Sequence, residues 1–254
     1  MNESVTLTVL PGIGEIMEGD DLAARISDAI AALGIAIDDH CVVVVAQKIV
    51  SKSEGRRIFL DEVKPSASAL EIAAITRKDP ALVECVLRES SEVLRVRTNV
   101  LIVRHRLGYV VANAGIDQSN VFAGGRSVCL MLPLDPEASA RRIREGLAKR
   151  LGAAPAVIVS DSFGRPWRRG VVNVALGASG LPSLVDCRGR VDRYGRVLRT
   201  TEVALADALA AAAGLVMGEE DQGTPVVVVA GMTWSAPETG AATLIRPLSE
   251  DLFQ

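Results

Sequence analysis

Apolar residues recur along this chain with two different periods, which predicts a mixture of helices and strands. Residues 20–34 carry apolar side chains three and four positions apart, between aspartates at the start and a glycine at the end, as in an amphipathic helix. This apolar stripe consists of Leu22, Ile26, Ala29, Ile30 and Leu33. Residues 41–45 and 225–230 instead form continuous valine-rich runs, which are typical of strands covered on both faces.

The rest of the chain also alternates between helical and extended patterns. Residues 66–90 predict one or two helices interrupted near Pro80. Three short runs after them predict a strand meander: 93–96, 100–103 and 109–112. One helix is expected from Asp135-Pro136 to Leu151, before Gly152, and another in the alanine-rich residues 203–216. The pattern therefore predicts an α/β fold whose middle block is α+β.

Composition limits the organisation of the protein and its partners. The 254 residues exceed one average domain, so one large domain or two intimately packed domains both fit. Hydrophobic residues make up 49% and charged residues 23%, a balance typical of globular proteins. A net charge of −3 offers no overall basic field for nucleic acid or for an anionic membrane. We therefore expect a small-molecule partner.

The expected compartment is the cytoplasm. The first ten residues lack the basic and apolar regions of a secretion leader, and no apolar run approaches the roughly 20 residues of a membrane span. The four cysteines are widely separated and are predicted to be reduced, mostly buried side chains. With only two histidines in the chain, a metal site would have to use oxygen ligands.

Charged residues follow one of the predicted buried strands. Residues 160–170, Ser-Asp-Ser-Phe-Gly-Arg-Pro-Trp-Arg-Arg-Gly, come directly after the apolar run 155–159 and are predicted to form a strand-end loop. Ionised groups leave water only when they are paired or bind an ion, and ligands of open α/β sheets gather beyond the carboxyl ends of strands. This segment is therefore our first candidate for a phosphate and metal site.

A second polar segment, residues 113–120, follows another predicted strand. Its sequence, Asn-Ala-Gly-Ile-Asp-Gln-Ser-Asn, suits a simple turn as well as a binding site, because these side chains mimic backbone hydrogen bonds. Magnesium and manganese favour carboxylate, hydroxyl and phosphate oxygens. If the two segments converge, Asp117 and Asp161 would form such a cation site.

Lys48 and Lys52 follow the first valine-rich run and lie four residues apart. In a helix, both would project from one face and could hold a phosphate, but the local pattern alone favours a solvated lysine pair. The G-x-x-x-x-G-K-[ST] phosphate loop is absent from the sequence.

Two further segments are rich in charge. Residues 186–196 carry Arg188, Arg190, Arg193 and Arg196, and either a phosphate-binding loop or a charged surface hairpin fits them. Residues 217–222, Met-Gly-Glu-Glu-Asp-Gln, taken alone are typical of a solvated acidic loop.

Taken together, these segments resemble the coenzyme F420-0:L-glutamate ligase family over nearly the full length of the chain. The segments that carry the resemblance are 19–22, 47–56, 113–120, 132–136, 160–168 and 192–196. The most specific of them is the one around Trp167. The resemblance implies a GTP-dependent ligase that uses two divalent metals, magnesium or manganese, and a potassium ion.

The resemblance also implies roles for individual residues. The implied metal ligands are Asp117, Asp161, Ser162 and Glu219. The implied nucleotide contacts are Ile13, Gly14, Glu15, Ile16, Gln47, Lys52, Asn120, Met217, Gly218, Glu220, Asp221, Gln222, Gly223 and Thr224. Lys52 and the 217–224 loop thus become binding elements and not merely solvated ones. Family members commonly carry proline where this chain has Gly14, and either glutamine or glutamate at position 219.

Amide formation implies the mechanism, because a carboxylate is a poor electrophile. The terminal carboxylate of the coenzyme precursor would attack the γ-phosphate of GTP, and the amine of L-glutamate would then displace phosphate from the acyl phosphate. Arg165, Arg168 and the arginines of 188–196 are the candidates for holding the acyl phosphate and the phosphodiester of the precursor.

The resemblance further implies two intimate α/β domains and a homodimer with the site near the subunit interface. Residues 1–254 would form the ligase unit, without the reductase-like domain that follows it in some relatives. Two alternatives stay open: a GTP- and metal-binding sensor without turnover, and an amide ligase for another phosphorylated acid.

Overall fold

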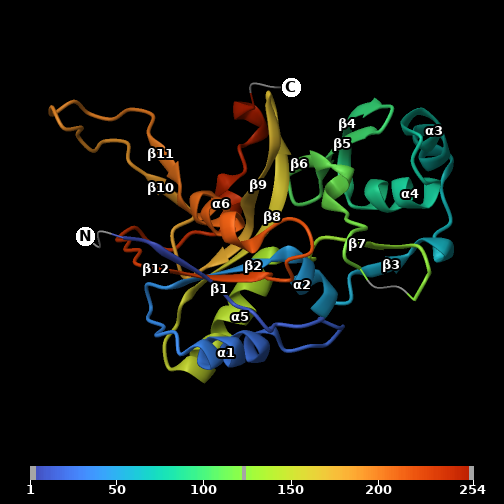
Figure 1. Ribbon diagram of the computed structural model, residues 1–254. Helices are drawn as coiled ribbons and strands as arrows, with labels where there is room; N and C mark the ends of the chain where they lie inside the picture. The colour runs from blue at the N-terminus through green and yellow to red at the C-terminus, as the bar shows by residue number, and fades with distance from the viewer. Residues whose placement is uncertain (1–3, 122–123, 252–254) are drawn as a thin grey trace.

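A five-stranded mixed sheet forms the centre of the molecule (Figure 1). The computed structural model describes residues 4–121 and 124–251, so both ends of the predicted 1–254 unit lie outside the described residues. In spatial order, the strands are β1 (Thr6–Val9), β12 (Val226–Ala230), β2 (Val42–Ala46), β8 (Ala156–Arg165) and β9 (Arg168–Ser179). The pair β2 and β8 is parallel, and the other neighbours are antiparallel.

Helices cover both faces of this sheet. In Figure 1, α1 (Leu22–Leu33) and α5 (Pro136–Leu151) lie below it, and α6 (Leu205–Met217) lies above it. The carboxylate of Asp21 accepts a hydrogen bond from the backbone of Ala24 and caps the first turn of α1, while Gly34 ends the helix in the left-handed conformation. The predicted extents of α1 and α5 are confirmed. The apolar faces and the capping residues of these two helices could therefore both be predicted from the sequence.

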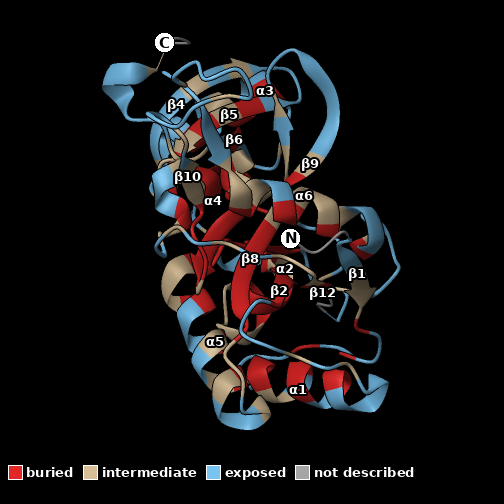
Figure 2. Ribbon diagram, turned by 90° about the vertical axis from the view of Figure 1, so that its left-hand side faces the viewer, coloured by how far each residue is buried: buried red, intermediate tan, exposed pale blue. Residues whose placement is uncertain are grey.

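The valine-rich strands are buried on both faces, as predicted. Val43 and Val45 pack with α1 and α5, whereas Val42 and Val44 pack on the side of α6. The same division applies to β12, and Figure 2 shows the buried centre running through β2 and β8. Two-sided burial explains why these strands show no alternation of polar and apolar residues.

A smaller α+β part has its own core. It consists of α3 (Ala67–Thr76), α4 (Pro80–Arg88), the strand pair β3 (Arg57–Phe59) and β7 (Val128–Leu130), and the meander β4 (Ser90–Arg97), β5 (Val100–His105) and β6 (Val110–Ala112). The predicted meander and the helix break near Pro80 are confirmed. Asp79 caps α4 through the backbone of Ala81, and Arg77 ends α3 in the left-handed conformation.

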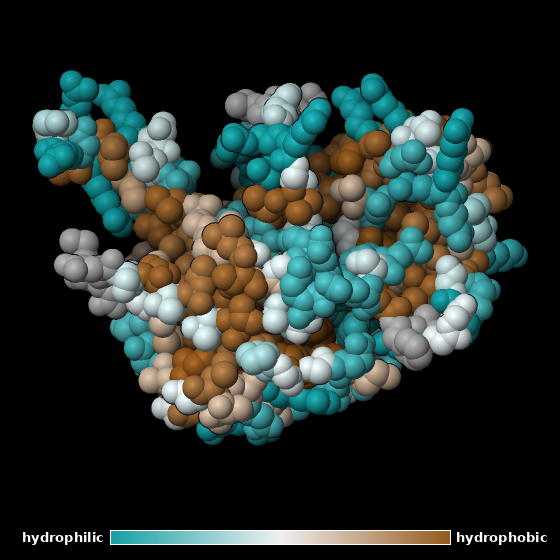
Figure 3. All heavy atoms as spheres, viewed as in Figure 1, coloured by the Kyte–Doolittle hydropathy of each residue, from teal (hydrophilic) through white to brown (hydrophobic). Residues whose placement is uncertain are grey.

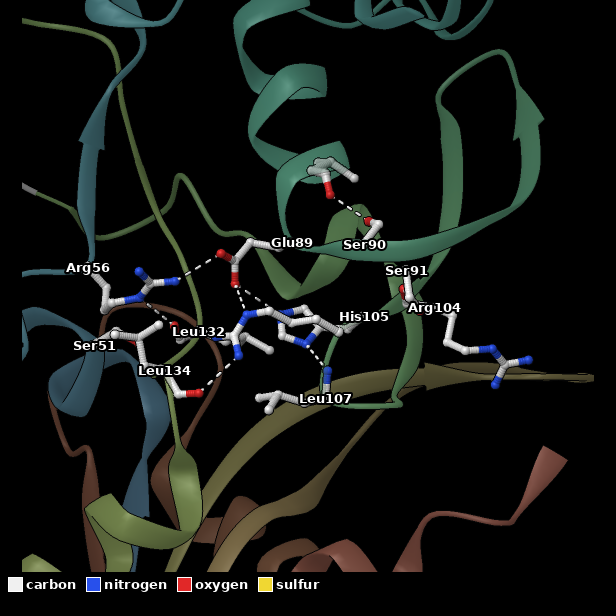
Figure 4. Close-up of polar contacts among 12 residues, drawn as sticks. Ser51, Arg56, Glu89, Ser90, Ser91, Arg104, His105, Leu107, Leu132 and Leu134 are labelled. Atoms are coloured by element: carbon white, nitrogen blue, oxygen red, sulfur yellow. Dashed lines mark hydrogen bonds and ion pairs between the residues drawn. The ribbon is translucent and has the colours of Figure 1, made fainter.

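Glu89 joins this part to the segments around the main sheet (Figure 4). Its carboxylate lies 3.2 Å from Arg56 Nη2, 3.0 Å from Arg106 Nε and 3.3 Å from His105 Nε2. Arg56 follows the short helix α2 (Gln47–Ser53), and its Nε donates to the carbonyl of Leu132. One buried carboxylate thus holds cations from segments on both sides of the junction.

Two predicted element boundaries are wrong. Residues 160–165 and 168–170 are not a loop, because β8 runs to Arg165 and pairs with β9, which begins at Arg168. Cross-strand pairs such as Phe163 with Val172 extend the ladder beyond the buried sheet. The helix predicted for 203–216 begins at Leu205, because β11 (Glu202–Ala204) pairs with β10 (Leu184–Asp186).

The arginine-rich segment 187–201 connects β10 and β11 and projects from the body as an arm (Figure 1). Val191 and Val197 form a β-bridge across it, and Arg188 pairs with Asp186 and Glu202 at 2.7 and 3.3 Å. Its geometry is that of the charged surface hairpin, one of the two alternatives for this segment.

Cysteine burial follows the sequence prediction closely. Cys41, Cys85 and Cys129 are buried free thiols, and Cys187, in the arm, is partly exposed. Within the two described stretches, none of the helices combines the length and apolar character needed to cross a bilayer.

Candidate functional site

A cavity of about 490 Å³ opens where the parallel strands β2 and β8 end at their carboxyl sides. Five further parts of the chain complete its wall: one face of α2, residues 117–120, residues 14 and 15, Asn173 of β9, and the 217–225 loop after α6. Carboxyl ends of neighbouring parallel strands are where α/β proteins place their ligands. The strand arrangement therefore accounts for the position of the cavity.

Asp117 and Asp161 both line this cavity, although they lie 44 positions apart in the sequence. Asp117 is held by a β-bridge to Leu130, at the end of β7. Asp161 lies on β8, opposite Val174 of β9. The predicted convergence of the two acidic segments is confirmed, while their roles as metal ligands stay a prediction.

The two carboxylates differ in their electrostatics. Burial raises the pKa of Asp161 to about 7, and the negative charge of Asp117 acts in the same direction, against the opposing effects of the Ser162 backbone, Lys48 and Gln47. Burial also opposes ionisation of Asp117, but Lys48 and Ser119 outweigh it and hold its pKa below the ordinary value. A cation placed between the two would favour ionisation of both carboxylates.

Both lysines of α2 line the cavity, so the solvated lysine pair that the local pattern alone favoured is not found. Lys48 Nζ lies 2.7 Å from Asp117 Oδ2 and donates to the carbonyl and the hydroxyl of Ser119. Lys52, with only 7% of its side chain exposed, lies 2.6 Å from Glu15 Oε1. The helical spacing i, i+4 places the two ammonium groups on the same face.

The 217–225 loop closes the side of the cavity next to α6. Thr224 Oγ1 donates to the carbonyl of Met217, and Asn120 Nδ2 donates to the carbonyl of Glu220 across the cavity at 2.9 Å. Every nucleotide contact implied in this loop lines the cavity, as do Gln47, Gly14 and Glu15. Gly14 has φ 71°, a conformation closed to proline, so the loop of this chain differs from one that carries proline there.

Other implied site residues lie elsewhere. Ile13 and Ile16 belong to the core between α1 and the sheet. Arg165 and Arg168 face each other near the tip of the β8–β9 hairpin, outside the lining of the cavity. The arm arginines do not line it either. In one chain, the structure therefore does not bring these cations to the two aspartates.

Three further polar residues line the cavity to which the sequence analysis assigned no individual role: Ser119 and Ser160, which lie within the predicted segments, and Asn173, which does not. Ser119 and Ser160 adjoin predicted site residues in the sequence. Asn173 carries no such signal, since it lies on β9 and reaches the cavity only because β9 pairs with β8. Strand pairing, which cannot be read from local sequence, brings it there.

The donor atoms suit a magnesium or manganese ion. Two carboxylates and the hydroxyl of Ser162 supply hard oxygen ligands, and magnesium is usually bound through one or two carboxylates with substrate phosphates and water. In the described part of the chain, no three Asp, Glu, His or Cys side chains converge as a ready metal cluster, so Glu219 does not join Asp117 and Asp161 here. The pocket therefore fits a cation shared with a phosphate ligand.

Comparison with known proteins agrees with these features. The profile of the family described as F420-0:Gamma-glutamyl ligase matches residues 12–231. The chain is 45% identical over 252 residues to the coenzyme F420:L-glutamate ligase of Methanothermobacter thermautotrophicus, covering 98% of this chain and 99% of the relative. It is 43% identical to the enzyme of that name from Methanocaldococcus jannaschii, over 86% of both chains, and 42% identical to that from Archaeoglobus fulgidus, over 96% and 94%.

A mixed α/β fold, an acidic and lysine-lined pocket, and this similarity define a ligase. The chain belongs to the F420-0:gamma-glutamyl ligase family.

Proposed function

We propose that this protein is a GTP-dependent ligase that adds γ-linked L-glutamate to coenzyme F420-0. The observation that carries the proposal is the convergence of Asp117, Asp161 and the two α2 lysines in one cavity of a member of this family. Carboxylates that can hold a divalent cation, beside ammonium groups that can hold phosphates, are the equipment that phosphoryl transfer requires.

The proposed reaction has two steps. A carboxylate oxygen of the acceptor attacks the γ-phosphorus of GTP, the bond to the β-phosphate oxygen breaks, and GDP leaves. The amine of glutamate then attacks the acyl carbon, phosphate leaves with the bonding electron pair, and the amine loses a proton. Activation as the acyl phosphate is needed because the amine can then displace phosphate, a good leaving group. Direct attack on the free carboxylate would have to expel an oxide ion, which is a very poor one.

The chain supplies positioning and charge for these steps. Lys48 and Lys52 lie where they can exchange their carboxylate partners for phosphate oxygens. A magnesium or manganese ion held by Asp117 and Asp161 would neutralise charge on the phosphates, and Ser162, the next residue of β8, would contribute to holding a second ion. Residues 217–224 and Asn120 would hold the rest of the nucleotide.

We also propose a homodimer. An apolar surface lies over α6 in Figure 3, where Leu215 is 82% exposed and Val216 is 37% exposed. Large exposed apolar patches mark contact sites. In such an assembly, Arg165, Arg168 and the arm arginines would be candidates for contacting the phosphodiester of the acceptor from outside the pocket of one chain. Light scattering that gives the mass of a single chain contradicts the dimer.

The decisive experiment incubates the protein with GTP, manganese, potassium, L-glutamate and coenzyme F420-0. We expect GDP, phosphate and a product heavier by one glutamyl unit, detected by mass spectrometry. GTP binding without any of these products would identify the non-catalytic sensor. GTP turnover only with a different phosphorylated acid would identify the other ligase alternative.

A further inference from the structure

The hydroxyl of Ser160 is buried beside the cavity without a partner. Ser160 is 1% exposed, lines the cavity and directly precedes Asp161 on strand β8. Among the described residues, no atom forms a hydrogen bond with its Oγ. A buried hydroxyl without a hydrogen bond is unfavourable, so its presence at the cavity wall indicates a partner that arrives with a ligand.

Asn173, on the neighbouring strand β9, is a second buried polar residue on the same face of the sheet as Ser160. Successive strand residues point to opposite faces, so Ser160 and Ser162 share a face that is opposite to that of Asp161. Asn173 pairs directly with Ser162 across the hairpin and is 7% exposed. Its Nδ2 donates to Met217 Sδ at 4.0 Å, and a thioether is a weak acceptor.

Gly214 provides the space for the Asn173 side chain. It lies in the interior of α6, where glycine is unfavourable relative to alanine. A Cβ atom at this position would lie 2.8 Å from Asn173 Oδ1 and 2.9 Å from its Cγ. A methyl group there would therefore displace the carboxamide. Gly214 thus leaves room for the Asn173 carboxamide, although a polar side chain is not needed for α6 to pack on β9.

We propose that Ser160 and Asn173 form a hydrogen-bonding pair that contacts an anionic oxygen, of a phosphate or a carboxylate, in the ligand of this cavity. The inference rests on the proposed function and adds two binding residues to it. Ser160 pairs with Ala175, so Asn173, two residues along β9, is its diagonal neighbour. Diagonal neighbours on one face of a strand pair lie about 7 to 8 Å apart, so one oxygen placed between these two side chains is within reach of both. Hydroxyl and carboxamide donors suit such an oxygen without adding charge.

The anionic oxygen that Ser160 contacts could belong to a phosphate of GTP or to a carboxylate of coenzyme F420-0 or glutamate, and the two cases give different results. If it belongs to GTP, the Ser160→Ala variant will bind GTP with a Kd about 5- to 10-fold higher than wild type. If it belongs to a carboxylate, GTP binding will be unchanged, and the KM for coenzyme F420-0 or for glutamate will rise by the same factor. Asn173→Ala and Gly214→Ala are expected to affect the same ligand as Ser160→Ala.

Thermal stability separates a binding role from a structural one. Ser160→Ala removes an unpartnered hydroxyl, so its Tm should equal or exceed that of wild type. The matched control is Ser183→Ala, at a fully buried serine outside the cavity whose Oγ donates to the carbonyl of Thr239 at 2.8 Å. This control should lower the Tm and leave every ligand constant unchanged.

The inference is overturned if Ser160→Ala, Asn173→Ala and Gly214→Ala all keep wild-type constants for GTP, coenzyme F420-0 and glutamate. It is also overturned if Ser160→Ala loses stability as Ser183→Ala does and keeps its ligand affinities. The affinities for GTP, coenzyme F420-0 and glutamate are all measurable by calorimetry without turnover. Wild-type protein that binds these ligands but forms no product would therefore refute the ligase proposal, while the three titrations would still decide the role of Ser160.

Discussion

The ammonium group of Lys48 lies 2.7 Å from Asp117 Oδ2 and also donates to the carbonyl and hydroxyl oxygens of Ser119. Three contacts fix this ammonium at the wall of the cavity that Asp117 and Asp161 also line. The cation therefore compensates Asp117 in the ligand-free chain and stands within reach of a bound phosphate. The local sequence pattern alone had favoured a solvent-exposed side chain for Lys48.

Replacing Lys48 should weaken the enzyme without unfolding it. In Lys48→Met, the apolar stem is kept and the ammonium is lost, so we expect kcat/KM to fall by about 10- to 100-fold, the value of a hydrogen bond to a charged group. Steady-state release of phosphate from GTP would measure it. Lys64→Met, at an exposed lysine outside the cavity, is the control and should behave as wild type. Equal activity of the two variants would remove Lys48 from the site.

The secondary structure around this site could be predicted from sequence because its determinants are local. The caps Asp21 and Gly34, the valine-rich strands and the break at Pro80 each lie within the element that they define. The sequence predicts a loop for residues 160–170 because their polar side chains resemble those of a loop. Their strand structure depends instead on the pairing of β8 with β9, which the local sequence does not reveal.

The site itself was predicted only in part. Asp117 and Asp161 carry a chemical signature, and their convergence followed from the expectation that strand ends meet. Asn173 had no such signature, because only strand pairing brings it opposite Ser162. The position of Arg165 near the hairpin tip depends in the same way on the length of the β8–β9 ladder.

The stability of the ligand-free protein should fall with rising pH because of Asp161. Its pKa is about 7 in the folded chain and 3.8 in the reference state, so the folded form binds the proton more tightly. Stability from this group is full below about pH 4 and is lost as the pH rises through about 7. Asp161→Asn should therefore exceed wild type in unfolding free energy at about pH 8 by on the order of 1 to 3 kcal/mol, and by much less near pH 4.

Urea unfolding at several pH values would measure this difference. Asp207→Asn serves as a comparison, because Asp207 is a partly buried carboxylate outside the cavity whose pKa burial also raises. A difference between wild type and Asp161→Asn that is independent of pH would contradict the assignment of the raised pKa to Asp161.

Manganese together with GTP should stabilise the folded protein through the two partly buried carboxylates of the cavity, Asp117 and Asp161. A ligand that binds only the folded state stabilises it by RT ln(1 + [L]/Kd), about 2.7 kcal/mol when its concentration is a hundred times Kd. We expect manganese with GTP to raise the Tm of wild type, and chelation by EDTA to remove the increase. In Asp117→Asn and Asp161→Asn, the increase should be lost or strongly reduced. An undiminished increase in both variants would place the cation elsewhere.

Glu89 should make the fold sensitive to acid. Burial alone would raise its pKa, but His105, Arg106 and Arg56 outweigh burial and hold it at about 2, against 4.5 in the reference state. Because the folded-state pKa is depressed, the stabilisation is present above about pH 4.5 and is lost as the pH falls towards 2. Glu89→Gln leaves the guanidinium groups of Arg56 and Arg106 without their counterion and should cost about 3 kcal/mol at neutral pH.

The control for this effect is Glu92→Gln, because Glu92 is a largely exposed carboxylate that pairs with Arg104 at 3.2 Å. Exposed ion pairs contribute about 0 to 1 kcal/mol, so this variant should unfold close to wild type. Urea unfolding between about pH 2 and 7 should show the gap between wild type and Glu89→Gln closing as the pH falls. If both variants unfold alike at neutral pH, Glu89 does not hold the α+β part against the segments around the main sheet, and that junction depends on apolar contacts instead.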